Sequence, residues 1–167
     1  MYDRKLTIEQ NLAMLAATPT RIADLRQPLS PVQLLTPPEP GQWSARDVLA
    51  HLRACADMWG KYIALILNED RPTFKAVNPT TWIKQTDYLE QEFQPMLQAF
   101  TIQRAELLDV LRPLPPEAWS RTATVTGAGK PRERTVHTYA QWLANHEQSH
   151  MRQFERIVKA LTSEVGV

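Results

Sequence analysis

The sequence predicts an all-α protein folded as a four-helix bundle. Apolar residues recur at helical spacing in four separate stretches, and no run of β-branched residues alternates as a half-buried strand would. With 167 residues, the chain is long enough for one domain with a substantial core and short for two. We therefore expect residues 1–167 to form a single domain whose amphipathic helices bury one common core.

The first helix is expected over residues 6–25. Pro19 lies inside this stretch directly after Thr18, so the helix should kink there or restart with Pro19 in its first turn. The segment SPVQLLTPPEPGQW follows and contains four prolines and a glycine. This composition excludes regular helix and indicates a fixed connection.

The second helix has the best-defined start in the sequence. Ser44 is a natural N-cap, and Asp47 stands three residues later in a capping-box arrangement. From there to residue 67, the inward-facing positions keep a spacing of three or four residues. This inward stripe consists of Val48, His51, Cys55, Met58, Tyr62 and Leu65.

The third and fourth helices are expected over residues 86–111, with a bend at Pro95, and over residues 136–161. The stretch between them, RPLPPEAWSRTATVTGAGKPRERTV, interrupts the helical period. It is compatible with a short helix at PPEAW or a brief hairpin around TGAGK. The inward stripe of the fourth helix is Tyr139, Leu143, His146, His150, Phe154, Ile157 and Leu161.

Three histidines thus fall on inward faces. His146 and His150 are one helical turn apart, a spacing that lets both imidazoles reach one ion. His51 lies on the second helix, and a bundle can bring it to the same ion. Burying three imidazoles without partners would cost on the order of 1 to 3 kcal/mol each. We therefore expect a divalent metal bound by these three residues, with a buried polar network as the alternative.

The string His-Glu-x-x-His at residues 146–150 also occurs on the helices of zinc peptidases. In the longer peptidase motif, two further positions hold glycine and a third histidine, and here they are occupied by Gln153 and Arg156. These surroundings argue against a peptidase.

Two blocks of the sequence resemble the DinB-like superfamily. They are PGQWSARDVLAHL, with its Trp-Ser helix start and a histidine in the third turn, and TYAQWLANHEQSHMRQ. The resemblance implies a four-helix bundle of the DinB-like type, often dimeric, that holds one divalent metal. The family's three histidine ligands fall on His51, His146 and His150. Characterised members of the superfamily include transferases and isomerases that use low-molecular-weight thiols, and many members have no established activity.

Four residues near these histidines each have two interpretations. Glu147 lies about 100° around the helix from His146, so it is a general base for a water molecule at the metal, or it faces solvent. Cys55 is a small core residue, or a thiolate ligand or nucleophile. Arg104 is an edge residue of the third helix, or it binds a substrate carboxylate. His137 points away from the other histidines, so a helix-start or surface role is expected.

Aromatic and basic residues leave two further alternatives open. Trp59 and Trp142 are core residues or the walls of a pocket. Lys130, Arg132 and Arg134 are most simply part of a solvated loop, with anion binding as the alternative.

Composition favours a small-molecule partner. A net charge of +1 supplies no strong field for nucleic acid or an anionic membrane surface. The charged N-terminus, the lack of a long apolar segment and a single cysteine predict a cytoplasmic protein without a membrane span. A homodimer is expected from the resemblance, with Ile63 and Leu67 as candidate surface residues.

These observations predict a metal-dependent enzyme that acts on a small molecule, by thiol-dependent transfer or isomerisation or by hydrolysis. Zinc, nickel, iron and manganese all accept imidazole, so the identity of the metal stays open. A low-molecular-weight thiol as co-substrate follows from the resemblance alone. The alternative is a non-enzymatic metal-binding or stress-related bundle with a structural metal or none.

Overall fold

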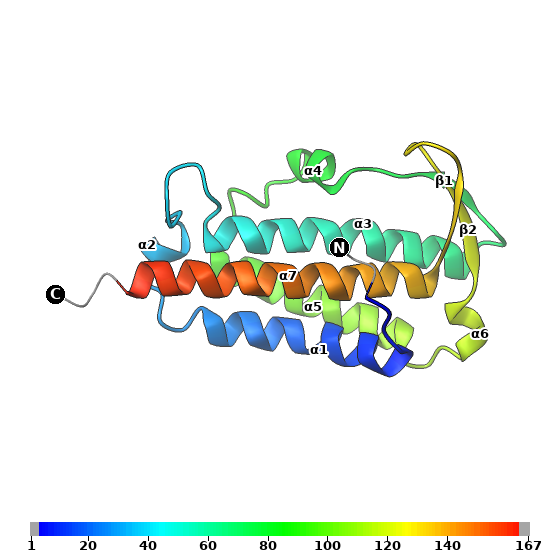
Figure 1. The fold of residues 1–167 in the computed structure, drawn as a ribbon, viewed down its shortest axis with the longest axis horizontal. Coiled ribbons are helices and arrows are strands. Elements are labelled where there is room, and N and C mark those ends of the chain that lie inside the picture. Colours follow the sequence, from blue (N-terminus) through cyan, green and yellow to red (C-terminus); the bar gives the residue numbers. More distant parts are fainter. Residues whose placement is uncertain (1–3, 164–167) are drawn as a thin grey trace.

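The computed structural model describes residues 4–163 as a bundle of four long helices with a small sheet at one end (Figure 1). Helices α1 and α3 lie on opposite sides of the bundle, and each packs against both α5 and α7. The expected four-helix architecture is therefore confirmed in its main part. The long helices are α1 (Ile8–Leu25), α3 (Ala45–Asn68), α5 (Phe93–Leu111) and α7 (Val136–Thr162).

Capping boxes fix the start of three long helices. The Ser44 hydroxyl accepts from the Asp47 amide, while the Asp47 carboxylate accepts from the Ser44 amide, as the sequence predicts. Thr135 and Thr138 form the equivalent pair at the start of α7. Because α3 and α7 run in opposite directions side by side, these two starts set the level at which their histidines meet.

The connection from α3 to α5 runs outside the bundle and carries α4 (Pro79–Trp82) and the 3₁₀ helix η1 (Ile83–Gln85). Asp57 of α3 anchors it, since its Oδ2 accepts from Trp82 Nε1 at 3.1 Å and from Tyr88 OH at 2.6 Å. The predicted helix start at residue 86 is therefore wrong. Helix α5 begins at Phe93, and Pro95 falls in its first turn, where an amide donor is not needed.

The expectation of an all-α chain is corrected by a three-stranded sheet. Strands β2 (Thr122–Thr126) and β3 (Arg132–Thr135) form the hairpin that the stretch around TGAGK allowed. Strand β1 (Thr73–Lys75) pairs with β2 in parallel, in the order β1-β2-β3. Gly127 at the hairpin turn has φ +91°, and a Cβ there would lie 2.7 Å from Lys75 Cγ, so a glycine lets β1 approach the turn.

Two short helices lie in the connections between the long ones. The proline-rich segment contains α2 (Pro31–Leu34), so the exclusion of helix there is wrong: Pro31 occupies the first turn and Ser30 caps it. Helix α6 (Pro116–Trp119) forms at the predicted PPEAW stretch.

Ile63 is buried, so it does not supply the dimer surface that the sequence assigned to it. Among residues 4–163, no helix combines the length and apolarity that a bilayer crossing requires.

A buried ion pair joins three helices inside the apolar core. Arg104 of α5 and Glu147 of α7 are 2% and 0% exposed, and the guanidinium contacts both carboxylate oxygens. Arg104 Nη1 also donates to the Leu15 carbonyl of α1 at 2.9 Å. That carbonyl is four residues before Pro19, which has no amide to donate to it. Helix α1 continues through Pro19 without restarting, because Arg104 supplies the missing donor.

We predict that Arg104→Met lowers the free energy of unfolding of the metal-free protein by about 3 to 5 kcal/mol, because it leaves a buried carboxylate without its counterion. The double variant Arg104→Met/Glu147→Met should recover most of this loss. Urea denaturation measures both. Arg112→Met, at the exposed end of α5, is the control and should change stability by about 0.5 kcal/mol or less. A loss for Arg104→Met as small as that of the control would contradict the prediction.

Candidate metal centre

The three predicted histidines meet in the groove between α3 and α7. His51 Nε2 lies 3.0 Å from His146 Nε2, and His150 Nε2 also lies 3.0 Å from His146 Nε2. His146 is buried, while His51 and His150 are half-buried at the surface end of the group. The structure thus brings together one histidine of α3 and two of α7, which we call the histidine cluster.

Neighbouring side chains orient each ring of the cluster. The Nδ1–H of His150 donates to Gln153 Oε1 at 2.7 Å, which leaves the Nε2 lone pair directed at the cluster. Trp43, just before α3, stacks on His150 at 6.0 Å and contacts His51 at 5.0 Å between ring centroids. Trp59 meets the His146 ring edge to face at 5.2 Å. Aromatic rings therefore border the cluster along both directions of the groove.

The environment keeps these imidazoles neutral. Burial and the neighbouring His150 lower the pKa of His51 to about 4. Burial and the two other histidines lower the pKa of His146 to about 2. Burial also lowers the pKa of His150, against the opposing effects of its Gln153 hydrogen bond and of Glu147. A neutral imidazole is the form that binds a metal.

Hydrogen bonding alone does not account for the cluster. An imidazole nitrogen carries either one proton or one in-plane lone pair, so His146 Nε2 can form only one well-aligned hydrogen bond, yet two other nitrogens face it. A cation accepts all three lone pairs at once. Two nitrogens that bind one ion at about 2.0 to 2.1 Å lie roughly 3.0 to 3.4 Å apart, depending on coordination number. The two spacings of 3.0 Å to His146 Nε2 therefore fit a divalent metal. The ligand atoms of His51, Cys55 and His146 all lie within 4.8 Å of one another.

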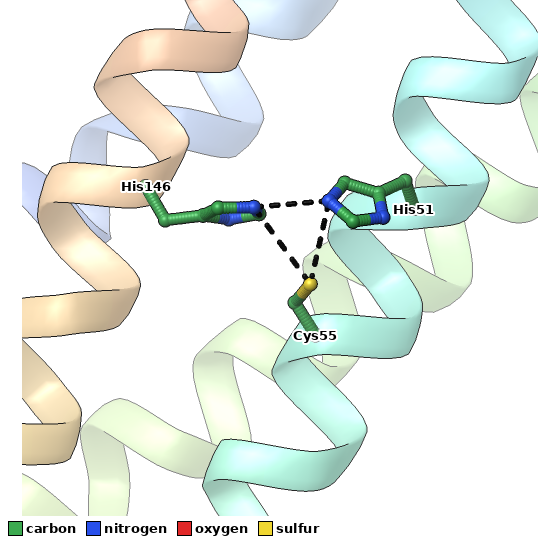
Figure 2. A group of neighbouring side chains, drawn as sticks. All are labelled: His51, Cys55 and His146. Carbon is green, nitrogen blue, oxygen red and sulfur yellow. Dashed lines mark hydrogen bonds between the residues drawn. The ribbon is translucent and has the colours of Figure 1, made fainter. Parts of the chain in front are cut away.

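Cys55 lies beside the cluster rather than simply filling the core. Figure 2 shows it below His51 on α3, facing His146 of α7, with Sγ 3.6 Å from His51 Nε2 and 3.8 Å from His146 Nε2. Both values are close to the roughly 3.5 Å expected when a thiolate and an imidazole share a metal. Burial, and then the carboxylates of Glu147 and Asp57, raise the pKa of the Cys55 thiol to about 12. Its geometry therefore permits ligation, while its surroundings disfavour the thiolate.

Glu147 and Arg104 lie behind the cluster. Glu147 is fully buried, so the solvent-facing interpretation is wrong, and its Oε2 accepts from Thr18 Oγ1 at 2.8 Å besides Arg104. Its hydrogen-bond partners come from α1 and α5, on the side away from His51. The interpretation of Arg104 as an edge residue is also wrong, because its guanidinium is buried. The general-base role of Glu147 stays a prediction.

His137 does not join the cluster. It lies in the first turn of α7, and its Nε2 contacts the Leu6 carbonyl at 2.9 Å. Sequence reasoning assigned no role at this site to Trp43 or Gln153. Gln153 stands one turn after His150 on the same helix, and this spacing is the signal that could have identified it. Trp43 precedes the capped start of α3, and only the packing of α7 brings it to His150.

Cavities open on both sides of the cluster along the groove. One, of about 730 Å³, is lined by Trp43 and His150 and by residues near the end of α7. The other, of about 300 Å³, lies toward the sheet and has Trp59 and Trp142 in its wall. The interpretation of these two tryptophans as pocket walls is therefore supported. A small molecule can reach the cluster without opening the bundle.

Comparisons with known proteins agree with this architecture. The structure of YfiT from Bacillus subtilis, described as a probable metal-dependent hydrolase with an unusual four-helix bundle topology, matches with a TM-score of 0.78. The identity is 17%, and the match covers 95% of this chain and 91% of that chain. No curated protein matches the sequence. The sequence model of the DinB superfamily matches residues 14–154, and the chain therefore belongs to the DinB superfamily.

Proposed function

We propose that this protein is a metal-dependent hydrolase of small molecules, with a divalent ion held by His51, His146 and His150. The observation that carries the proposal is the approach of two imidazole nitrogens to His146 Nε2 at 3.0 Å each, which one cation satisfies better than any arrangement of protons. The description of YfiT as a probable metal-dependent hydrolase supports the choice of reaction.

The residues around the cluster supply the rest of a hydrolytic site. His51, His146 and His150 would hold the ion as neutral imidazoles, and the ion would then supply its charge and open coordination positions to activate a nucleophile or polarise a carbonyl. Gln153 holds His150 in the tautomer that binds through Nε2. The Arg104–Glu147 pair fixes the turn of α7 that carries His146. Trp43 and Trp59 supply aromatic surfaces against His51 and His146 on the two sides of the cluster.

A structural metal is the second candidate, and Cys55 is the observation that favours it. Three imidazoles and a thiolate would close a tetrahedral site and leave no position for a substrate. The two alternatives differ in what Cys55→Ala does. An open catalytic site retains its metal after this substitution, because no ligand is lost. A closed structural site loses metal affinity and stability together.

We predict that protein purified without an affinity tag retains about one divalent ion per chain. His51→Ala, His146→Ala and His150→Ala should each lose most of it, because two remaining imidazoles bind a divalent ion much less tightly. His137→Ala is the matched control and should retain the ion, because His137 lies on α7 with His146 and His150 but outside the cluster. Elemental analysis after dialysis gives the answer. Full retention by His51→Ala would exclude His51 as a ligand.

We predict metal-dependent hydrolysis of at least one class in a panel of small carboxylic esters, thioesters, amides and lactones. Protein reconstituted in turn with zinc, nickel, iron or manganese is assayed with and without an added small thiol. Chelation of the wild-type protein and the substitution His150→Ala should each lower turnover to the uncatalysed rate. Added metal should restore turnover in the chelated wild type and not in His150→Ala. Turnover that persists in His150→Ala would contradict the proposal. A strict requirement for the thiol would replace hydrolysis with thiol-dependent transfer.

A further inference from the structure

The cavity between the sheet and the α3–α7 groove has an unusual combination of walls. Its floor is aromatic and includes Trp59, Trp142 and Tyr139. Its rim carries three cations, Lys130 at the hairpin turn and Arg132 and Arg134 on β3, and none of its lining residues is acidic. We call it the sheet-side cavity. The sequence alone left these three cations as part of a solvated loop, with anion binding as the alternative.

The three cations are not neutralised within the described part of the chain. The ion pairs found among residues 4–163 are Arg21–Glu155, Arg46–Asp47 and Arg104–Glu147. Arg134 is half-buried, and its guanidinium lies over the Trp142 ring at 4.8 Å from the centroid. That contact holds the planar group against the aromatic wall. Nη1 donates to the Glu133 carbonyl at 3.4 Å, and the other N–H groups of the guanidinium are left for a further acceptor. A cavity with this rim attracts anions.

The sheet-side cavity adjoins the histidine cluster, with the Trp59 side chain between them. Trp59 contacts the His146 ring at 5.2 Å and the Trp142 ring at 6.5 Å between centroids. A molecule lying against Trp59 and Trp142 therefore has the basic rim on one side and, on the other, the Trp59 ring that contacts His146. The volume of about 300 Å³ suits a small organic molecule and excludes a folded partner.

We propose that the sheet-side cavity binds the anionic end of a small organic acid with a flat, unsaturated or aromatic body, and that Arg134 is its main anchor. The body packs on Trp59 and Trp142, while Lys130 and Arg132 add to the field at the rim. Such an acid would be the substrate class of the proposed hydrolase. The binding site itself does not depend on that function; only the identification of the bound acid as a substrate rests on it.

Three probes of nearly the same shape test the charge requirement: benzoate, benzamide and benzamidine. Each is titrated into the metal-free, ¹⁵N-labelled full chain, and the indole N–H signals of Trp142, Trp59 and Trp43 are followed by NMR. Benzoate should shift the Trp142 and Trp59 signals in a saturable way, with a dissociation constant on the order of millimolar for so small a probe. Benzamidine should bind at least about tenfold more weakly, because its charge is repelled by the rim.

Arg134→Gln should weaken benzoate binding about tenfold, while Arg134→Lys, which keeps the charge but loses the planar fork, should lie between the two. Arg112→Gln is the matched control: it removes the same charge from α5, which contributes no residue to this cavity, and should bind benzoate as the wild type does. The indole spectrum of each variant without probe reports whether it is folded.

Three results would overturn the proposal. One is equal binding of benzoate and benzamidine, and another is unchanged binding by folded Arg134→Gln. The third is a shift of Trp43, which lines the other cavity, with no shift of Trp142. Because the titration uses metal-free protein, its failure leaves the metal and hydrolysis predictions intact. Conversely, if the purified chain retains no metal but binds benzoate, the assignment of the cavity holds and the proposed hydrolase function fails.

Discussion

The guanidinium of Arg104 is the constraint on which the rest of the bundle depends. It lies where α1, α5 and α7 meet, donates to the Leu15 carbonyl that Pro19 leaves without an amide donor, and neutralises the buried Glu147. Glu147 is the residue next to His146. The position of that imidazole is thus tied to two other helices through a pair of charges that cannot separate without leaving one buried and uncompensated.

In zinc peptidases, the histidines and the glutamate of the His-Glu-x-x-His motif serve the same metal site. In this protein they face different parts of the bundle. The histidines face α3 and form the cluster, while the glutamate faces α1 and α5 and joins the core. Its contacts therefore favour a positioning role, with chemistry left to groups in the groove. The buried side of the groove is backed by the Arg104–Glu147 pair. The surface side is bordered by Trp43, the hairpin and two cavities, where a substrate can enter.

Local sequence signals predicted the elements that carry the cluster. Ser44 and Asp47 identified the start of α3, and the three-and-four spacing of apolar residues placed His51, His146 and His150 on inward faces. The strand β1 was missed because three residues carry too little pattern and its partner β2 lies some fifty residues later. The Arg104–Glu147 pair was missed because charged residues on amphipathic helices usually face solvent, and only the relative rotation of α5 and α7 buries these two.

Whether the histidine cluster is an open metal site depends most directly on Cys55, which lies within reach of the same ion. X-ray absorption spectroscopy of the metal-loaded protein counts the atoms bound to the ion and separates sulfur from nitrogen by bond length. For an open site we expect three imidazole nitrogens at about 2.0 to 2.1 Å, with exchangeable oxygen ligands such as water completing the coordination. A sulfur at about 2.3 Å would contradict it, because Cys55 would then close the site and make the metal structural.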